Sequence, residues 1–140
     1  MPDKQESMDF ITTIPDHAGK FVQTCKEVFN IDMDYSVQSI KMLDGIIDRA
    51  WDGKQPNDID NMIILFGSYL GEAIKKNHGG EWDYDENFGI VLKNFENWTI
   101  TIFPFDKVRK KFLEGKDESL TFYYQTALYI IAQEKAMKVK

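Results

Sequence analysis

The sequence predicts a single α+β domain, because helical and strand-like hydrophobic patterns occupy separate parts of the chain. Apolar residues recur at helical spacing up to residue 78, alternate between residues 81 and 103, and return to helical spacing after residue 104. Segregated helices and strands are typical of α+β folds, whereas regular alternation indicates α/β folds. The 140 residues fit one domain, placed at residues 15–140 after an amino-terminal arm at residues 1–14.

Three helices are predicted before the strands. Asp16 is a candidate amino-terminal cap of the first helix, and Ser36 or Asp34 can cap the second. The third helix is predicted from Asn57 to the glycine pair at residues 79–80. Each carries an apolar stripe: Phe21, Val22, Cys25, Val28 and Phe29 in the first helix, Ile40, Leu43, Ile47, Ala50 and Trp51 in the second, and Met62, Ile63, Phe66, Leu70, Ala73 and Ile74 in the third.

Three short runs with strand character follow, in the sequences EWDYD, FGIVLK and NWTITIF. Turn-forming residues separate the runs, so we predict a three-stranded antiparallel meander. Trp98 and Ile102 share one face of the last strand. Two carboxyl-terminal helices are predicted, over residues 105–113 and from about residue 117.

Two glycines, Gly67 and Gly71, interrupt the third helix at a spacing that places both on one face. Glycine costs a helix about 1 kcal/mol relative to alanine, so the missing side chains need a compensating role. We favour close packing of another element against this face. The alternative is a ligand pocket between this face and the sheet, with a lining of Gly67, Tyr69, Gly71, Glu72, Trp82 and Trp98.

Glu72 follows the second glycine and precedes Lys76 by four residues. This spacing and order favour an ion pair on the helix surface. A catalytic carboxylate is the alternative, but general acid–base chemistry usually needs a second polar group, and no other acid lies within one helical turn. We therefore expect a solvated ion pair.

Asp44, Asp48 and Asp52 form a ridge of like charge along the second helix. The ridge is interpreted either as a solvated face or as a docking surface for a basic protein, where complementary charge raises the association rate. The basic sequence KVRKKFLEGK at residues 107–116 has the opposite sign. It is expected to balance an acidic neighbour or to supply a self-association contact.

Composition excludes several classes of function. The net charge of −6 and the pI near 4.9 disfavour nucleic acid as a partner. Cys25 is the sole cysteine and excludes both an internal disulfide and a thiolate metal site. The sequence DYDENFG lacks the glycine and glutamate of a calcium loop, so no metal or cofactor is predicted. With neither a signal-peptide pattern nor a long apolar segment, a cytoplasmic location without membrane contact is expected.

The stretch from residue 34 to residue 124 resembles an uncharacterised family of small bacterial domains of unknown function. The resemblance rests on the sequence YLGEAI, on Gly80 and Trp82, and on FPFDKVRKKFLEG. It implies an accessory or intracellular bacterial domain and carries no activity with it.

These observations favour a non-catalytic protein-binding module that uses the acidic ridge. An immunity protein that neutralises a basic toxin is one concrete form of this prediction. A small enzyme or ligand-binding domain with the pocket at Gly67 and Gly71 is the first alternative. A homodimeric structural module is the second.

Overall fold

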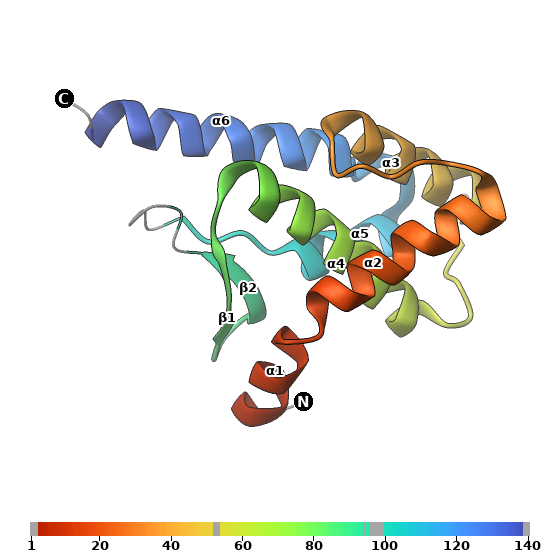
Figure 1. Ribbon diagram of the computed structural model, residues 1–140, viewed down its shortest axis with the longest axis horizontal. Helices are drawn as coiled ribbons and strands as arrows, with labels where there is room; N and C mark the ends of the chain where they lie inside the picture. The colour runs from red at the N-terminus through yellow and green to blue at the C-terminus, as the bar shows by residue number, and fades with distance from the viewer. Residues whose placement is uncertain (1–2, 52–53, 94, 96–99, 139–140) are drawn as a thin grey trace.

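The computed structural model describes residues 3–51, 54–93, 95 and 100–138. In this part of the chain, six α-helices accompany one two-stranded antiparallel sheet, and the α+β class is confirmed (Figure 1). The elements are α1 (Lys4–Ile11), α2 (Ile14–Thr24), α3 (Val37–Trp51), α4 (Ile59–His78), β1 (Glu81–Asp85), β2 (Gly89–Lys93), α5 (Pro104–Glu114) and α6 (Leu120–Lys138). A short π-helix, η1 (Cys25–Phe29), extends α2, and a 3₁₀ turn, η2 (Gly115–Asp117), follows α5.

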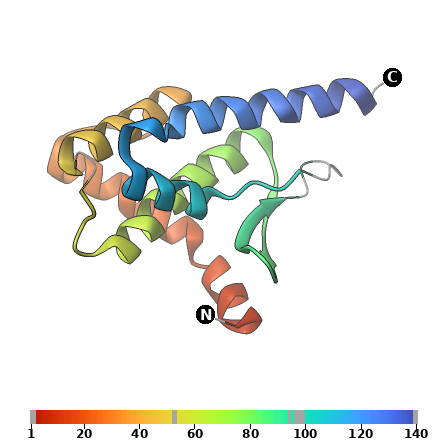
Figure 2. The same cartoon turned by 180° about the vertical axis from the view of Figure 1, so that it is seen from behind.

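Helix α4 is the centre of the fold. Helix α2 packs on its front in Figure 1, and α5 packs behind it, as the reverse view in Figure 2 shows. Every residue from Phe66 to Ile74 is buried, so the middle of α4 is covered on all sides. An α-helix surrounded in this way needs apolar or small residues around its whole circumference, which explains its alternation of large side chains with glycine, serine and alanine.

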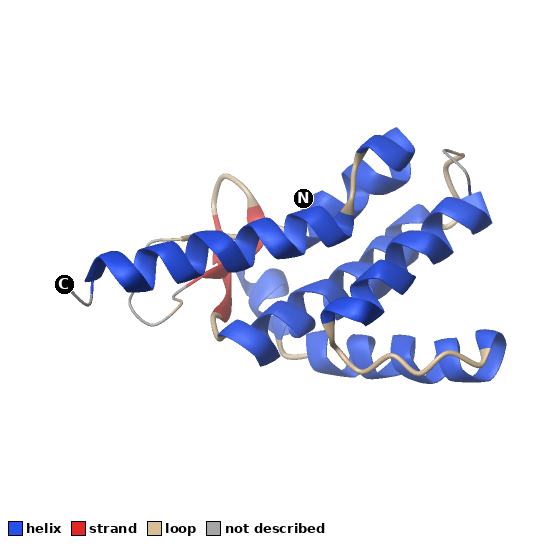
Figure 3. Cartoon of the chain, turned by 90° about the horizontal axis from the view of Figure 1, so that it is seen from above, coloured by secondary structure: helices blue, strands red, loops and turns tan. Residues whose placement is uncertain are grey.

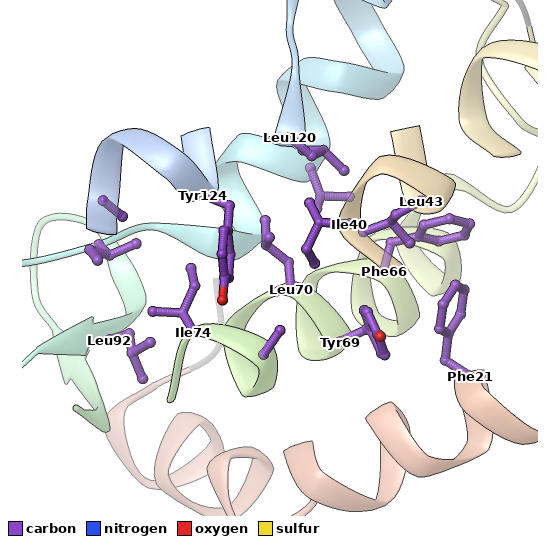
Figure 4. Packing of buried hydrophobic residues seen from close by; sticks show 14 of the residues in the cluster. Phe21, Ile40, Leu43, Phe66, Tyr69, Leu70, Ile74, Leu92, Leu120 and Tyr124 are labelled. Carbon is purple, nitrogen blue, oxygen red and sulfur yellow. The ribbon is translucent and has the colours of Figure 1, made fainter. Parts of the chain in front are cut away.

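The core gathers around α4 from elements distant in the sequence. Helices α3 and α6 pack against each other, and α6 also contacts α4. Figure 4 shows the buried side chains of α2, α3, β2 and α6 grouped around those of α4. The labelled residues are Phe21, Ile40, Leu43, Phe66, Tyr69, Leu70, Ile74, Leu92, Leu120 and Tyr124. The apolar stripes predicted for the first three helices are therefore confirmed as core faces except at the end of the first one, where Val28 and Phe29 are 66% and 50% exposed.

Local capping explains several helix boundaries. The Ser36 hydroxyl accepts a hydrogen bond from the Ser39 N–H at 3.2 Å, which confirms the predicted start of α3. The glycine pair at residues 79–80 ends α4 as predicted, and both glycines have positive φ. Helix α2 begins at Ile14, so Asp16 lies in its first turn and does not cap it.

The sheet is smaller than predicted, and Figure 3 shows how little of the structure it occupies. Strands β1 and β2 pair from Glu81 with Lys93 to Asp85 with Gly89. The third strand predicted in the sequence NWTITIF does not form in its described part, residues 100–103, where the one pairing is an isolated bridge between Ile102 and Leu92. Residues 97–99 of that sequence lie outside the described residues. The ladder does not continue toward α5, because the next residue that would bond to β2 is Pro104, which has no N–H and begins α5. The N–H of Phe103 points to the other side and donates to the Tyr123 hydroxyl of α6 at 2.8 Å.

Helix α1 lies within the stretch predicted to be an arm. Asp3 caps it by accepting a hydrogen bond from the Glu6 N–H at 2.8 Å. The helix contacts both strands of the hairpin, and its Ser7 is buried. Residues 4–11 therefore pack against the hairpin and contribute to its surroundings.

Candidate functional site

Asp44 of the predicted acidic ridge caps helix α6. One carboxylate oxygen accepts the Leu120 N–H at 2.8 Å, and the other accepts the Thr121 N–H at 2.8 Å and the Thr121 hydroxyl at 2.6 Å. A carboxylate at a helix amino terminus satisfies free N–H groups and interacts favourably with the helix dipole. The side chain is 14% exposed. Asp44 therefore fastens α6 to α3.

Asp48 makes an ion pair with Lys111 of α5, whose ammonium nitrogen lies 2.7 Å from the Asp48 carboxylate and 3.7 Å from that of Asp44. The Lys111 side chain is only 2% exposed. A buried ammonium is costly unless it is paired, so these two carboxylates neutralise it. The expectation that the basic stretch balances an acidic neighbour is confirmed at Lys111. Asp52 lies outside the described residues.

Aromatic rings fill the space above the two glycines of α4. A Cβ atom on Gly67 would lie 2.5 Å from the Phe105 ring, and one on Gly71 would lie 2.0 Å from the Trp82 ring. Distances this short exclude any side chain at either position without movement of a ring. The packing interpretation of the glycines is confirmed, because β1 and α5 both approach this face.

Glu72 is buried, and the predicted solvated ion pair with Lys76 is wrong. The residue is 6% exposed, and its carboxylate accepts a hydrogen bond from the Trp82 indole N–H at 2.9 Å. Lys76 instead lies over the Tyr35 ring, 5.0 Å from its centroid. The bond between Glu72 and Trp82 fixes the indole ring above Gly71.

Tyr69 points into the core and is fully buried, so it is not available to line an open pocket. Its hydroxyl accepts the Tyr35 N–H at 2.8 Å and donates to the Ser39 hydroxyl at 2.5 Å. Burial raises the pKa of the Tyr69 hydroxyl to about 12. Tyr69 therefore ties the turn before α3 to α4. Trp98, the last predicted pocket residue, lies outside the described residues.

A groove of about 600 Å³ lies elsewhere, between α1, the start of α4, the β1–β2 hairpin and α5. We call it the hairpin groove. Apolar side chains from all four of these elements line it. They include Phe10, Ile64, Phe88, Ile90, Phe103 and Phe105. Phe105 connects the groove to the packed face of α4, because the same ring lies over Gly67.

Phe88 lines the hairpin groove, and 67% of its surface is exposed to solvent. The Asp85 carboxylate accepts the N–H groups of Asn87 and Phe88 at 2.8 and 3.1 Å, which orders the hairpin turn. The Phe88 ring lies 5.1 Å from that of Phe103, at an angle of 58°. The turn therefore presents an exposed aromatic side chain in a defined position.

Charged side chains surround this apolar surface. Four carboxylates line the groove, those of Glu6, Asp60, Glu86 and Asp106, together with the guanidinium of Arg109. In the described residues, no three side chains of the types that bind metals converge on one point. The carboxylates are therefore distributed around the groove as separate charges.

Cys25 is 1% exposed, and burial raises the pKa of its thiol to about 11. This agrees with its predicted role as a small apolar residue. We expect a thiol-specific reagent at pH 8 to label the native protein at least 100-fold more slowly than the unfolded protein, because the thiolate is the reactive form and each pKa unit changes its population about tenfold. Labelling rates with and without denaturant measure this, and equal rates would contradict it.

Across the described residues, no helix combines the length and the apolar character that crossing a membrane requires. No family model matches the chain, and comparison with curated proteins and with solved structures finds no similar protein. The family resemblance of residues 34–124 therefore stays a prediction, and any statement about function rests on the geometry of the chain itself.

Proposed function

We propose that this protein is a non-catalytic binding module that engages another protein through the hairpin groove. The observation that carries the proposal is the exposed Phe88 beside a groove of about 600 Å³ with apolar walls. Exposed aromatic side chains next to an apolar depression are typical of the centres of protein interfaces.

The groove replaces the ridge of Asp44 and Asp48 as the proposed contact surface. A partner that docked on those two carboxylates would compete with the amino terminus of α6 and with the buried Lys111. Phe88 holds no other element in place in this way, and a partner can cover its ring, which is 67% exposed. Covering apolar surface contributes about 25 cal/mol per Å² before the costs of association.

A small apolar ligand is the second candidate. The volume of the groove falls within the range of about 300–1,000 Å³ that is usual for small-molecule sites. Its walls are mainly aromatic and aliphatic, so such a ligand would be held largely by burial of apolar surface. Selection of binding peptides against the wild-type protein separates a protein partner from a small ligand.

Phe88→Ala is expected to weaken binding of groove-directed peptides at least tenfold, with little change in stability. Peptides are first selected from a random displayed library against the wild-type protein, and their affinities are then measured by calorimetry. Truncation of an aromatic hot-spot residue at the centre of an interface typically costs about 2 kcal/mol or more, which exceeds the roughly 1.4 kcal/mol that corresponds to a tenfold change in affinity. Because the ring is 67% exposed, its loss leaves the core intact.

Phe122→Ala is the matched control, because Phe122 on α6 is 69% exposed and does not line the groove. It should leave peptide affinity unchanged. Selected peptides that bind both variants equally well would contradict the proposed site. A library that yields no binding peptide, while small apolar compounds shift the NMR signals of Phe88 and Ile90, would favour the second candidate.

A further inference from the structure

The charges around the hairpin groove indicate what kind of partner segment enters it. We infer that this segment is basic and presents an apolar side chain flanked by lysine or arginine, an inference that rests on the proposed function. The apolar side chain covers Phe88 and the walls of the groove, and the flanking cations meet the carboxylates at its edge.

The four carboxylates approach the groove from four different elements. Glu6 belongs to α1, Asp60 to the first turn of α4, Glu86 to the hairpin turn and Asp106 to the first turn of α5. All four residues are exposed. Each of the four elements that form the groove therefore contributes a carboxylate, which a single acidic helix face would not provide.

Few cations of the protein itself neutralise this set. Among the described lining residues, Arg109 is the one cationic side chain, so the lining has a formal charge of −3 from four carboxylates and one guanidinium. Asp106 also has an ion pair with Lys110 at 3.4 Å, but both side chains are more than half exposed. Exposed ion pairs of this kind contribute little and exchange readily for others.

The overall charge of −6 has the same sign as the groove. Carboxylates around a surface with apolar walls concentrate negative potential, which attracts cationic partners and repels acidic ones. Apolar contact alone does not discriminate between partners of different charge. The carboxylates therefore supply specificity, and the aromatic surface supplies most of the affinity.

Three synthetic peptides test the inference with calorimetry on the full-length protein. They share a central phenylalanine–leucine pair and differ in their flanks, which are all lysine, all serine or all glutamate. We expect the lysine peptide to bind at least tenfold more tightly than the serine peptide in 50 mM salt, and the glutamate peptide to bind most weakly. The lysine advantage should shrink in 300 mM salt, because mobile ions screen exposed charges.

The double variant Asp60→Asn and Glu86→Gln should remove most of the lysine advantage and leave the affinity of the serine peptide unchanged. A second double variant, Glu27→Gln and Asp32→Asn, is the matched control. It changes the net charge by the same amount at exposed residues that do not line the groove, and it should preserve the advantage.

Equal affinities for the three peptides, or an advantage that the control variant also removes, would overturn the basic-segment inference. The proposed function would survive that result if Phe88→Ala still weakened binding. Tighter binding of the glutamate peptide that disappears in Arg109→Gln would overturn the inference in favour of an acidic segment. If no peptide binds, the inference fails, and the library experiment with Phe88→Ala decides separately whether the groove binds proteins at all.

Discussion

Lys111→Met is expected to lower the free energy of unfolding by about 3 kcal/mol, because it leaves two partly buried carboxylates without their cation. Methionine preserves most of the side-chain volume, so the loss reports mainly on charge. Removal of one partner from a buried ion pair typically costs about 3–5 kcal/mol. The lower end is expected here, since Asp48 is 29% exposed and water compensates part of its charge. Denaturant unfolding followed by circular dichroism measures the change.

The adjacent residue provides the control. Lys110 forms an exposed ion pair with Asp106, so Lys110→Met should change the stability by less than about 0.5 kcal/mol. Adding Asp48→Leu to Lys111→Met should restore part of the loss, because removing both members of a buried pair is much less costly than removing one. Equal effects of Lys110→Met and Lys111→Met would show that the buried pair does not stabilise the fold.

The role of Asp44 and Asp48 shows where prediction from the sequence stops. Their spacing correctly placed both on one face of α3. Spacing does not say which element packs on that face, and the cation that meets them is 63 residues from Asp48 in the sequence. Helix α6 begins at Leu120, three residues after the predicted start near residue 117, because Ser119 caps it: the Ser119 hydroxyl accepts the Phe122 N–H at 3.0 Å. The second cap, Asp44, comes from α3 and could not be predicted from the local sequence.

The helices were more predictable than the sheet. A helix satisfies its own backbone groups and needs an apolar stripe, which the sequence displays directly. A strand needs a partner at the right register, and alternation alone does not supply one. Ile102 meets Leu92, but the next residue that would bond to β2 is Pro104, which has no N–H and begins α5. The alternating pattern that ends at Ile102 therefore predicted more sheet than the described residues contain.

The hairpin groove was not predicted, because no single segment carries it. Its walls come from four elements that are separated in the sequence, and each contributes only a few side chains. The local feature that could have indicated it is Phe88, an aromatic residue in a polar turn between two strands. The sequence also suggested a pocket at Gly67 and Gly71, but aromatic side chains from other elements already fill that face of α4.

Gly71→Ala is expected to lower the free energy of unfolding by about 2 kcal/mol, even though alanine is the better helix former. The new Cβ would lie 2.0 Å from the Trp82 ring, with Pro104 at 3.3 Å beside it. Overpacking of this kind typically costs about 1–3 kcal/mol or more. Movement of the ring also strains the indole bond to the buried Glu72, which adds to the cost. Together these losses exceed the gain of about 1 kcal/mol in helix propensity.

Gly19→Ala is the same substitution as Gly71→Ala, but we expect it to have the opposite effect on stability. Gly19 lies inside α2, is exposed, and a Cβ placed on it would meet no other atom within 4 Å. Its replacement should therefore raise the free energy of unfolding, by up to about 1 kcal/mol. Thermal and denaturant unfolding of both variants give the two signs directly.

The Trp82→Leu background tests whether contact with the indole ring causes the loss of stability in Gly71→Ala. Leucine removes the ring atoms that lie closest to Gly71, so Gly71→Ala should cost much less there than in the wild-type protein.

Peptide binding at the hairpin groove should persist in folded Gly71→Ala, because neither Gly71 nor Trp82 lines the groove. If Gly71→Ala stabilised the protein, as Gly19→Ala is expected to do, the Trp82 ring would move at little cost, and packing would not be the reason for glycine at position 71. If a folded Gly71→Ala protein lost peptide binding, the face of α4 that carries Gly67 and Gly71 would be part of the binding site after all.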